Sequence, residues 1–268
     1  MSRFDDEPPA PPYVPPPSDA PAKQLRDLGW GMPMRWLRAG LGDFFASAGL
    51  GLFYGVSFWL MAMVLSFVFV NKPEYTMTMA SGCLLVGPFL AMGLYEVSRR
   101  RERGEPVHWI GSMLCWQAHW RSMAMLVGVL IVLELLWGRA ALVVVAVFFD
   151  TGFASTNDVI GAIFRPENLD FVLAYMAVGA GFAALVYAIS VVSIPMILDR
   201  DTDAVSAAIV SMEVVVSHPG VMVWWGCLIS GLVALSLLLP WGLGLVLVGP
   251  VLGHASWHAY RGCVQWLS

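Results

Sequence analysis

Charged residues are scarce in this sequence. They make up 13% of the 268 residues, whereas soluble domains usually carry about 25%. Hydrophobic residues reach 58%, and apolar runs long enough to cross a bilayer as helices recur along the chain. This composition argues against a water-soluble fold and for an integral membrane protein.

Several functional signatures are also missing. The four cysteines are isolated and form no C-x-x-C pair, so neither a disulfide framework nor a cysteine metal site is indicated. Only one short basic run is present, which argues against nucleic-acid binding. There is no G-x-S-x-G motif, no phosphate-binding loop and no paired carboxylates near a histidine within the membrane. The sequence therefore names no catalytic residue and does not indicate an enzyme.

The apolar runs predict about six transmembrane helices, over residues 50–70, 77–97, 123–137, 171–198, 221–239 and 243–260. Residues 140–149 either extend the third span or form a re-entrant segment. Two further segments, 30–45 and 109–121, mix apolar, aromatic and charged residues and are typical of helices in the headgroup layer. We predict an all-α, polytopic membrane helix bundle.

The chain divides into two parts. Residues 1–29 begin with a proline-rich stretch that has too little apolar surface to fold, so we predict a disordered cytoplasmic tail. Residues 30–268 form the predicted integral membrane domain. No cleavable signal peptide is visible ahead of the first apolar run, and we expect insertion through an internal helix.

The distribution of basic residues predicts the orientation. With the N-terminus in the cytoplasm, only Lys72, Arg139 and Arg165 of the 15 basic residues fall outside. Because cytoplasmic loops are enriched in lysine and arginine, and because six spans is an even number, we predict that both termini are cytoplasmic.

An internal repeat relates distant parts of the chain. The motif Leu-Val-Gly-Pro occurs at 85–88 and again at 247–250. The larger repeat is predicted to be an interfacial helix followed by a transmembrane hairpin, used three times. It places six polar residues at comparable depths on three related helices, and they form a candidate functional face on the cytoplasmic side: Glu96, Arg99, Asp199, Arg200, His258 and Arg261. Structural locking of the helix ends is the alternative interpretation of this face.

Three residues are candidates for chemistry, and one of them, His258, also belongs to the candidate functional face. His254 and His258 are four residues apart and share one helix face, which makes them weak candidates for a metal site. Glu134 is an acid within an apolar run, and such residues are functional candidates because their burial is unfavourable. Pairing with another helix is the structural alternative for Glu134. We expect no cofactor.

Three motifs together resemble a known family. They are LLVGPFLAMGLYEVSRRRERG at 84–104, SIPMILDRDTDAV at 193–205 and LGLVLVGPVLGHASWHAYRG at 243–262. The chain is similar to a bacterial family of uncharacterised integral membrane proteins, catalogued as a domain of unknown function. Some members carry a provisional label of cytochrome c oxidase subunit I. The resemblance implies a location in the bacterial inner membrane.

The oxidase label does not fit the histidine content. A haem–copper subunit needs six histidines in about twelve spans, whereas this chain has five histidines. The favoured hypothesis is a non-catalytic accessory or scaffold protein, associated at most with a respiratory complex. A small-solute transporter or channel is the alternative, and a haem or metal-binding membrane protein is a second alternative. The expected partners are the lipid bilayer and either another membrane protein or further copies of the chain.

Overall fold

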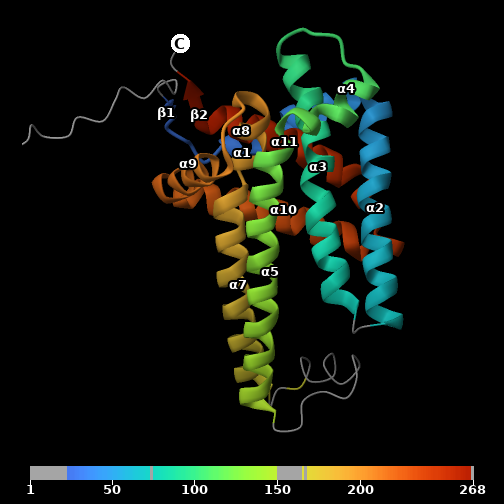
Figure 1. Cartoon of the computed structure of the whole chain (residues 1–268), viewed down its shortest axis with the longest axis vertical. Helices are drawn as coiled ribbons and strands as arrows, with labels where there is room; N and C mark the ends of the chain where they lie inside the picture. Colours follow the sequence, from blue (N-terminus) through green and yellow to red (C-terminus); the bar gives the residue numbers. More distant parts are fainter. Residues whose placement is uncertain (1–22, 73–74, 150–164, 166–167, 267–268) are drawn as a thin grey trace, which may run out of the picture.

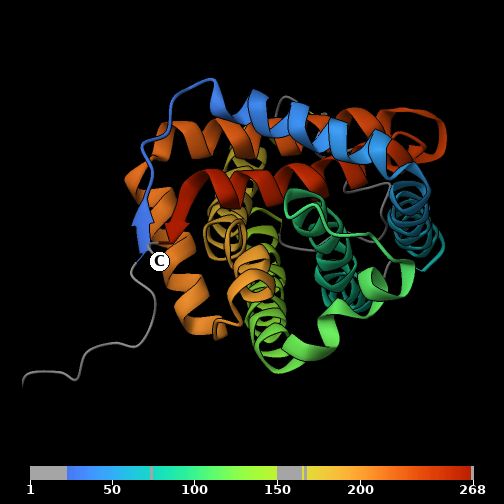
Figure 2. The ribbon, with the colours of Figure 1, turned by 90° about the horizontal axis from the view of Figure 1, so that it is seen from above.

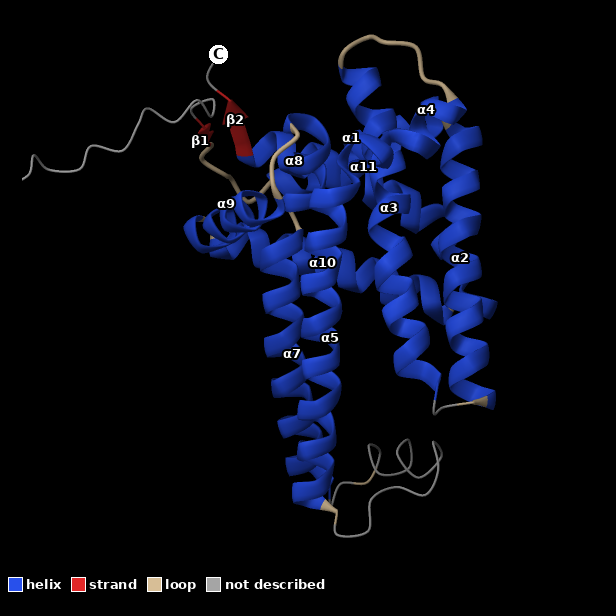
Figure 3. Cartoon of the chain, viewed as in Figure 1, coloured by secondary structure: helices blue, strands red, loops and turns tan. Residues whose placement is uncertain are grey.

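The computed structural model describes residues 23–72, 75–149, 165 and 168–266, and almost all of them are helical (Figure 3). The proline-rich residues 1–22 and most of the polar loop after Asp150 lie outside the described residues. The predicted all-α helix bundle is therefore confirmed.

Four long helices form two antiparallel hairpins that stand side by side (Figure 1). The first hairpin pairs α2 (Ala48–Asn71) with α3 (Thr76–Glu102), and the second pairs α5 (Trp120–Phe148) with α7 (Leu169–Ser190). Because α5 continues without interruption, residues 140–149 extend the third predicted span rather than forming a re-entrant segment.

Three helices run across these hairpins instead of along them. Seen from above, α2, α3, α5 and α7 appear end-on, while α1, α10 and α11 lie side-on (Figure 2). Their bounds are Met32–Ala46 for α1, Pro219–Leu238 for α10 and Leu245–Cys263 for α11. The short helix η4 (Pro240–Gly242) joins α10 to α11, and there Trp59 of α2 donates a hydrogen bond to the carbonyl oxygen of Trp241 at 2.8 Å.

Five helical stretches of the described residues are long and apolar enough to cross a membrane: Ala48–Asn71, Met79–Glu102, Trp109–Phe148, Leu169–Arg200 and Pro219–Leu238. The predicted sixth span corresponds to α11, which is not among them. Its second half carries histidine, tryptophan and arginine side chains that lower its hydropathy. The Leu-Val-Gly-Pro copies thus lie in helices of different orientation, and the threefold repeat is not confirmed (Figure 2).

Shorter elements close the end of the molecule drawn uppermost in Figure 1. They are α4 (Trp109–Leu114), η2 (Cys115–His119), α8 (Ser193–Arg200) and α9 (Ala204–Ser217). The N-cap of α9 is Asp203, whose side chain accepts hydrogen bonds from the backbone amides of Val205 and Ser206.

The helix α11 packs closely on its neighbours because glycines face it. A Cβ atom at Gly55 of α2 would overlap the carbonyl oxygen of Val246. One at Gly40 of α1 would lie 2.6 Å from the backbone nitrogen of Ala255. Side chains at these two positions would separate the helices, so the glycines permit the contact between α11 and both helices.

The two chain ends meet. Strand β1 (Lys23–Leu25) pairs antiparallel with β2 (Val264–Trp266), with Gln24 opposite Gln265. The last residues of the predicted tail therefore take part in the fold. The described beginning and end of the chain lie side by side at the upper end of the molecule (Figure 1).

Burial is concentrated at this upper end. The part of the molecule formed by α1, α4, α8, α9, α11 and the adjoining ends of the long helices is called the upper region. The lower region comprises residues 59–71, 76–87, 133–148 and 169–181. Among the described side chains of the lower region, Phe171 is the one large hydrophobic residue that is buried. Most of the lower region thus presents apolar side chains outward, as expected for contact with lipid.

Candidate functional site

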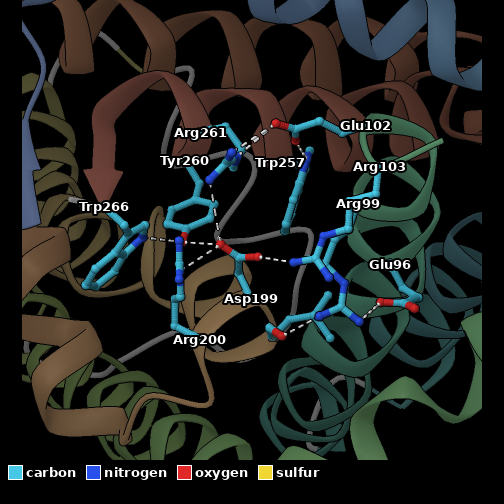
Figure 4. Close-up of polar contacts among 11 residues, drawn as sticks. Glu96, Arg99, Glu102, Arg103, Asp199, Arg200, Trp257, Tyr260, Arg261 and Trp266 are labelled. Carbon is cyan, nitrogen blue, oxygen red and sulfur yellow. Dashed lines mark hydrogen bonds and ion pairs between the residues drawn. The ribbon is translucent and has the colours of Figure 1, made fainter. Parts of the chain in front are cut away.

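A cluster of arginines and carboxylates joins the ends of three helices in the upper region (Figure 4). The arginine run closes α3, Asp199 and Arg200 close α8, and Arg261 lies in the last turn of α11. Cations in a final helical turn interact favourably with the partial negative charge of the helix C-terminus. We define the charged cluster as Glu96, Arg99, Arg100, Glu102, Arg103, Asp199, Arg200 and Arg261.

Asp199 is the centre of the charged cluster. Its carboxylate lies 3.1 Å from the Arg103 guanidinium, 3.5 Å from that of Arg200 and 3.8 Å from that of Arg261. Tyr260 also donates a hydrogen bond to it at 2.8 Å. The Asp199 side chain is only 4% exposed, and such burial is tolerated because every nearby cation compensates the charge.

Glu96 forms a second centre on α3. Its carboxylate pairs with Arg99 at 2.5 Å and with Arg100 at 2.6 Å, at helical spacings of three and four residues. Arg99 also donates a hydrogen bond to the carbonyl oxygen of Leu198 at 2.9 Å. This contact attaches α3 directly to the last turn of α8.

Glu102 attaches α3 to α11. Its carboxylate accepts hydrogen bonds from Arg261 at 3.1 Å and from the indole nitrogen of Trp257 at 2.9 Å. The end of β2 joins the same cluster, since Trp266 donates a hydrogen bond to the hydroxyl of Tyr260 at 2.9 Å. Its ring also lies 5.1 Å from the Arg200 guanidinium, a cation–π contact.

A separate polar network surrounds Asp43, next to the charged cluster. The Asp43 carboxylate on α1 accepts a hydrogen bond from Ser98 at 2.6 Å and one from Arg101 at 2.9 Å. His258 of α11 contacts it at 2.8 Å, and His254 lies 2.8 Å from the Ser98 hydroxyl. We call these five residues the Asp43 network, which connects α1, α3 and α11.

Burial and hydrogen bonding in the Asp43 network shift the pKa values of Asp43 and His254. Burial alone would raise the pKa of Asp43, but hydrogen bonds from His258, Ser98 and Arg101 outweigh it and lower that pKa to about 2. Burial lowers the pKa of His254 to about 4, although the charge of Asp43 opposes this shift. Asp43 is therefore ionised and His254 neutral near pH 7.

The neutral state of His254 has a structural consequence. Because Ser98 gives its hydroxyl hydrogen to Asp43, its oxygen is left to accept one from Nδ1 of His254. The Nε2 atom then carries the lone pair, and it is buried without a hydrogen-bond partner among the described residues.

The structure brings some predicted site residues together and separates others. Asp199, Arg200 and Arg261 meet in the charged cluster, and Glu96 pairs with Arg99 beside them. His258 instead belongs to the Asp43 network. Glu134 lies apart in the lower region, where Ser81 of α3 donates a hydrogen bond to its Oε2 atom at 2.6 Å.

The weak metal candidates His254 and His258 turn their hydrogen-bonded nitrogens to different partners, Ser98 and Asp43. Within the described ranges, no group of three or more histidine, cysteine or acidic side chains is arranged to hold a metal ion.

Sequence reasoning missed three residues of the charged cluster and the Asp43 network. Asp43 lies within the segment 30–45, which was predicted only as an interfacial helix, yet it is the one acidic residue of α1 and is 8% exposed. Glu102 is the single acid among four arginines at 99–103, which was a usable signal. Ser98 carried no signal, since a serine beside an arginine run is unremarkable in sequence.

These features define a class of protein: a polytopic helical membrane protein whose helix ends are joined by ion pairs on one side. Residues 75–199, just under half of the chain, match the family described as predicted integral membrane protein (DUF2189). This match confirms the predicted resemblance to a membrane domain of unknown function, and it carries no oxidase label. No curated protein and no solved structure matches the chain.

Proposed function

We propose that this chain is a non-catalytic accessory or scaffold protein of the bacterial inner membrane, and that the charged cluster is its partner-binding face. The observation that carries the proposal is the pairing of Asp199. A buried carboxylate held by three arginines and a tyrosine is a rigid support rather than a group free to exchange protons with a substrate.

The arginines around Asp199 favour docking. The side chains of Arg103, Arg200 and Arg261 are 49%, 38% and 36% exposed. Each is therefore held by the buried Asp199 carboxylate and is still accessible to solvent. Arginine fixed in this way is suited to carboxylates of a partner protein, because less rotamer freedom is lost on binding. The expected partner is an acidic segment of another membrane protein.

The placement of the chain ends supports the proposed orientation. Because β1 pairs with β2, residues 23 and 266 lie together, which requires an even number of membrane crossings between them. The arginine-rich ends of α3, α8 and α11 lie at the same end of the molecule (Figure 1). By the preference of basic residues for the cytoplasm, this end and both termini are proposed to be cytoplasmic.

The test is purification in native lipids followed by native mass spectrometry. We expect a stoichiometric membrane-protein partner that is lost in Arg103→Glu and Arg261→Glu, because both changes reverse charge on the docking face. The matched control Arg35→Glu alters an exposed arginine of α1 outside the cluster and should retain the partner. A respiratory subunit as the partner would identify the complex.

Two outcomes contradict the proposal. A homo-oligomer that conducts a solute in vesicles would favour the transporter alternative. Periplasmic activity of a reporter fused after Arg103 or Ser268 would overturn the orientation, whereas a reporter after Asp158 should be periplasmic.

A further inference from the structure

A polar pocket lies at the upper start of α5, apart from the charged cluster. It is an open space of about 440 Å³ between this helix start and the turn that joins α8 to α9, and its volume is within the range of small-molecule sites. Ala118 and Trp120 are among its lining residues. The others are polar or charged, and they are Gln117, His119, Arg121, Ser122, Asp201 and Asp203. The walls can therefore form both hydrogen bonds and ion pairs with a ligand.

The pocket offers charges of both signs. Arg121 is exposed and contacts the ring of Trp120 at 5.6 Å, but it forms no ion pair with any described residue. Asp201 contacts His119 at 2.8 Å, and its side chain is still 80% exposed. Asp203 caps α9, and hydrogen bonds from Ser206 lower the pKa of its carboxyl, so it is ionised near pH 7. A cation and two carboxylates thus remain accessible from the pocket.

The length of α5 places the pocket at the level of the lipid headgroups. The helix has 29 residues, which at about 1.5 Å per residue gives about 44 Å. This length is close to the thickness of a bilayer together with both headgroup layers, about 40–45 Å. Trp120 begins the helix and is 53% exposed, and tryptophan is enriched at the membrane surface. The pocket is therefore within reach of lipid headgroups.

An apolar face of α5 continues from the pocket into the membrane. Positions 121, 125, 129, 132 and 136 follow one another at spacings of three or four residues, so they share one side of the helix. After Arg121, this face carries side chains that are between 45% and 55% exposed: Met125, Val129, Val132 and Leu136. A molecule with a charged head and long apolar chains would match the pocket and the face together.

The charges of the pocket select the headgroup. The planar guanidinium of Arg121 is suited to a phosphate. Asp201 and Asp203 would repel a headgroup whose only charge is its phosphate, but they can accept hydrogen bonds from an ammonium group. A phosphate ester that also carries a primary ammonium satisfies both sides, whereas a quaternary ammonium has no N–H to donate.

We propose that this pocket binds the phosphoethanolamine headgroup of a membrane lipid. The phosphate lies against Arg121, the ammonium group donates to Asp201 and Asp203, and the acyl chains follow the apolar face of α5. The proposal does not rest on the partner-binding face, because none of the pocket residues belongs to the charged cluster.

The test is lipid titration into the detergent-solubilised full chain, read by native mass spectrometry. It compares phosphatidylethanolamine, phosphatidylcholine and phosphatidylglycerol with identical acyl chains. We expect the first to bind at least about threefold more tightly than the other two, which is the scale of exposed ion pairs. Arg121→Gln should weaken its binding by a similar factor. The control Arg38→Gln changes an exposed arginine of α1 outside the pocket and should leave the preference unchanged.

A second variant removes a carboxylate and keeps the helix cap. Asparagine caps helices as well as aspartate does, so Asp203→Asn should preserve α9. It should weaken phosphatidylethanolamine binding and strengthen phosphatidylglycerol binding, and a loss of folding would not change the two in opposite directions. Equal affinity of the intact chain for the three lipids, or an unchanged preference in Asp203→Asn, would overturn the proposal.

Free phosphoethanolamine distinguishes a lipid from a soluble ligand with the same charged groups. It should compete for the pocket much more weakly than the lipid, because it has no acyl chains to lie along Met125 and Val129. Competition at the same concentration as the lipid would identify a soluble phosphate ester as the ligand and would overturn the assignment to a lipid.

Discussion

One helix passes through two different environments. At its upper end, α5 buries Met123, Leu126 and Val127, each at most 1% exposed. Further along the same helix Leu136 and Leu142 are 52% and 67% exposed. The sequence of α5 is mainly apolar in both places, so hydrophobicity does not distinguish the two regions. The difference is that protein packs around the upper region and lipid is left to surround the lower one.

The charges follow the same division. In the upper region, Asp199 and Asp43 are each bonded to several donors from different helices. In the lower region, Ser81 donates a hydrogen bond to one oxygen of Glu134, and the other oxygen has no hydrogen-bond partner among the described residues. The ion pairs and hydrogen bonds that stabilise the fold through charged side chains therefore lie mainly in the upper region.

The largest expected loss of stability comes from a substitution at the contact of α2 with α11. Gly55→Ala should lower the free energy of unfolding by about 3 kcal/mol or more, because the added Cβ overlaps the backbone of Val246 and neither helix can yield locally. Gly82→Ala in the lower region is the control, since no atom lies within 4 Å of its added Cβ. Thermal unfolding in detergent measures both. Equal stability of the two variants would show that α11 does not cross α2 this closely.

A pair of truncations on α5 separates the two regions directly. Met123→Ala should lower the free energy of unfolding by about 3 kcal/mol, because it leaves a cavity at a side chain that is 0% exposed. Leu136→Ala should change it by less than about 0.5 kcal/mol, since lipid fills the vacated surface in both states. Chemical unfolding in mixed micelles gives both values. A large loss in Leu136→Ala would place that residue in a protein contact.

Acid should weaken the upper region through His254. Its folded pKa of about 4 lies below the ordinary value of 6.5, so the unfolded chain binds the proton more readily and stability falls as the pH drops from 6.5 toward 4. Between pH 6.5 and 5 the loss from this group should be about 2 kcal/mol. Asp43, with its pKa lowered to about 2, stays ionised over that range and contributes no slope.

The control for this effect is His254→Gln, which retains a polar side chain but cannot titrate. Its unfolding midpoint should depend less on pH than that of the unchanged chain, whose neighbouring groups Asp43, His258 and Arg101 are the same. If the two slopes coincide, the acid sensitivity belongs to another group.

Helix positions could be predicted because the apolar runs are long and end at charged residues or prolines. The predicted span 50–70 corresponds to α2, and 221–239 to α10, each within about two residues. Their orientation could not be predicted. The crossing of α11 depends on Gly40 and Gly55 facing it, and glycine pairs in an apolar run are equally compatible with many helix contacts.

The site was accessible to sequence reasoning only in part. Glu96 and Arg99 could be paired because they are three residues apart on one helix. The contact between Asp199 and Arg261 was suggested only by comparable depth in the predicted repeat. Asp43 and Ser98 are 55 residues apart, and no local pattern relates them. Their meeting depends on the docking of α1 against α3 and α11, which is a property of tertiary packing.

The pairing of β1 with β2 bears on the order in which the chain is made. Residues 23–25 leave the ribosome long before 264–266, so the first strand has no partner until residues 264–266 have been made. The same delay applies to Arg26, whose backbone amide bonds to the carbonyl oxygen of Cys263. Until then the early helices can be inserted but the upper end cannot close. A nascent chain stalled before residue 264 should therefore leave its first strand accessible to protease, and the emergence of residues 264–266 is the step that lets the upper end close.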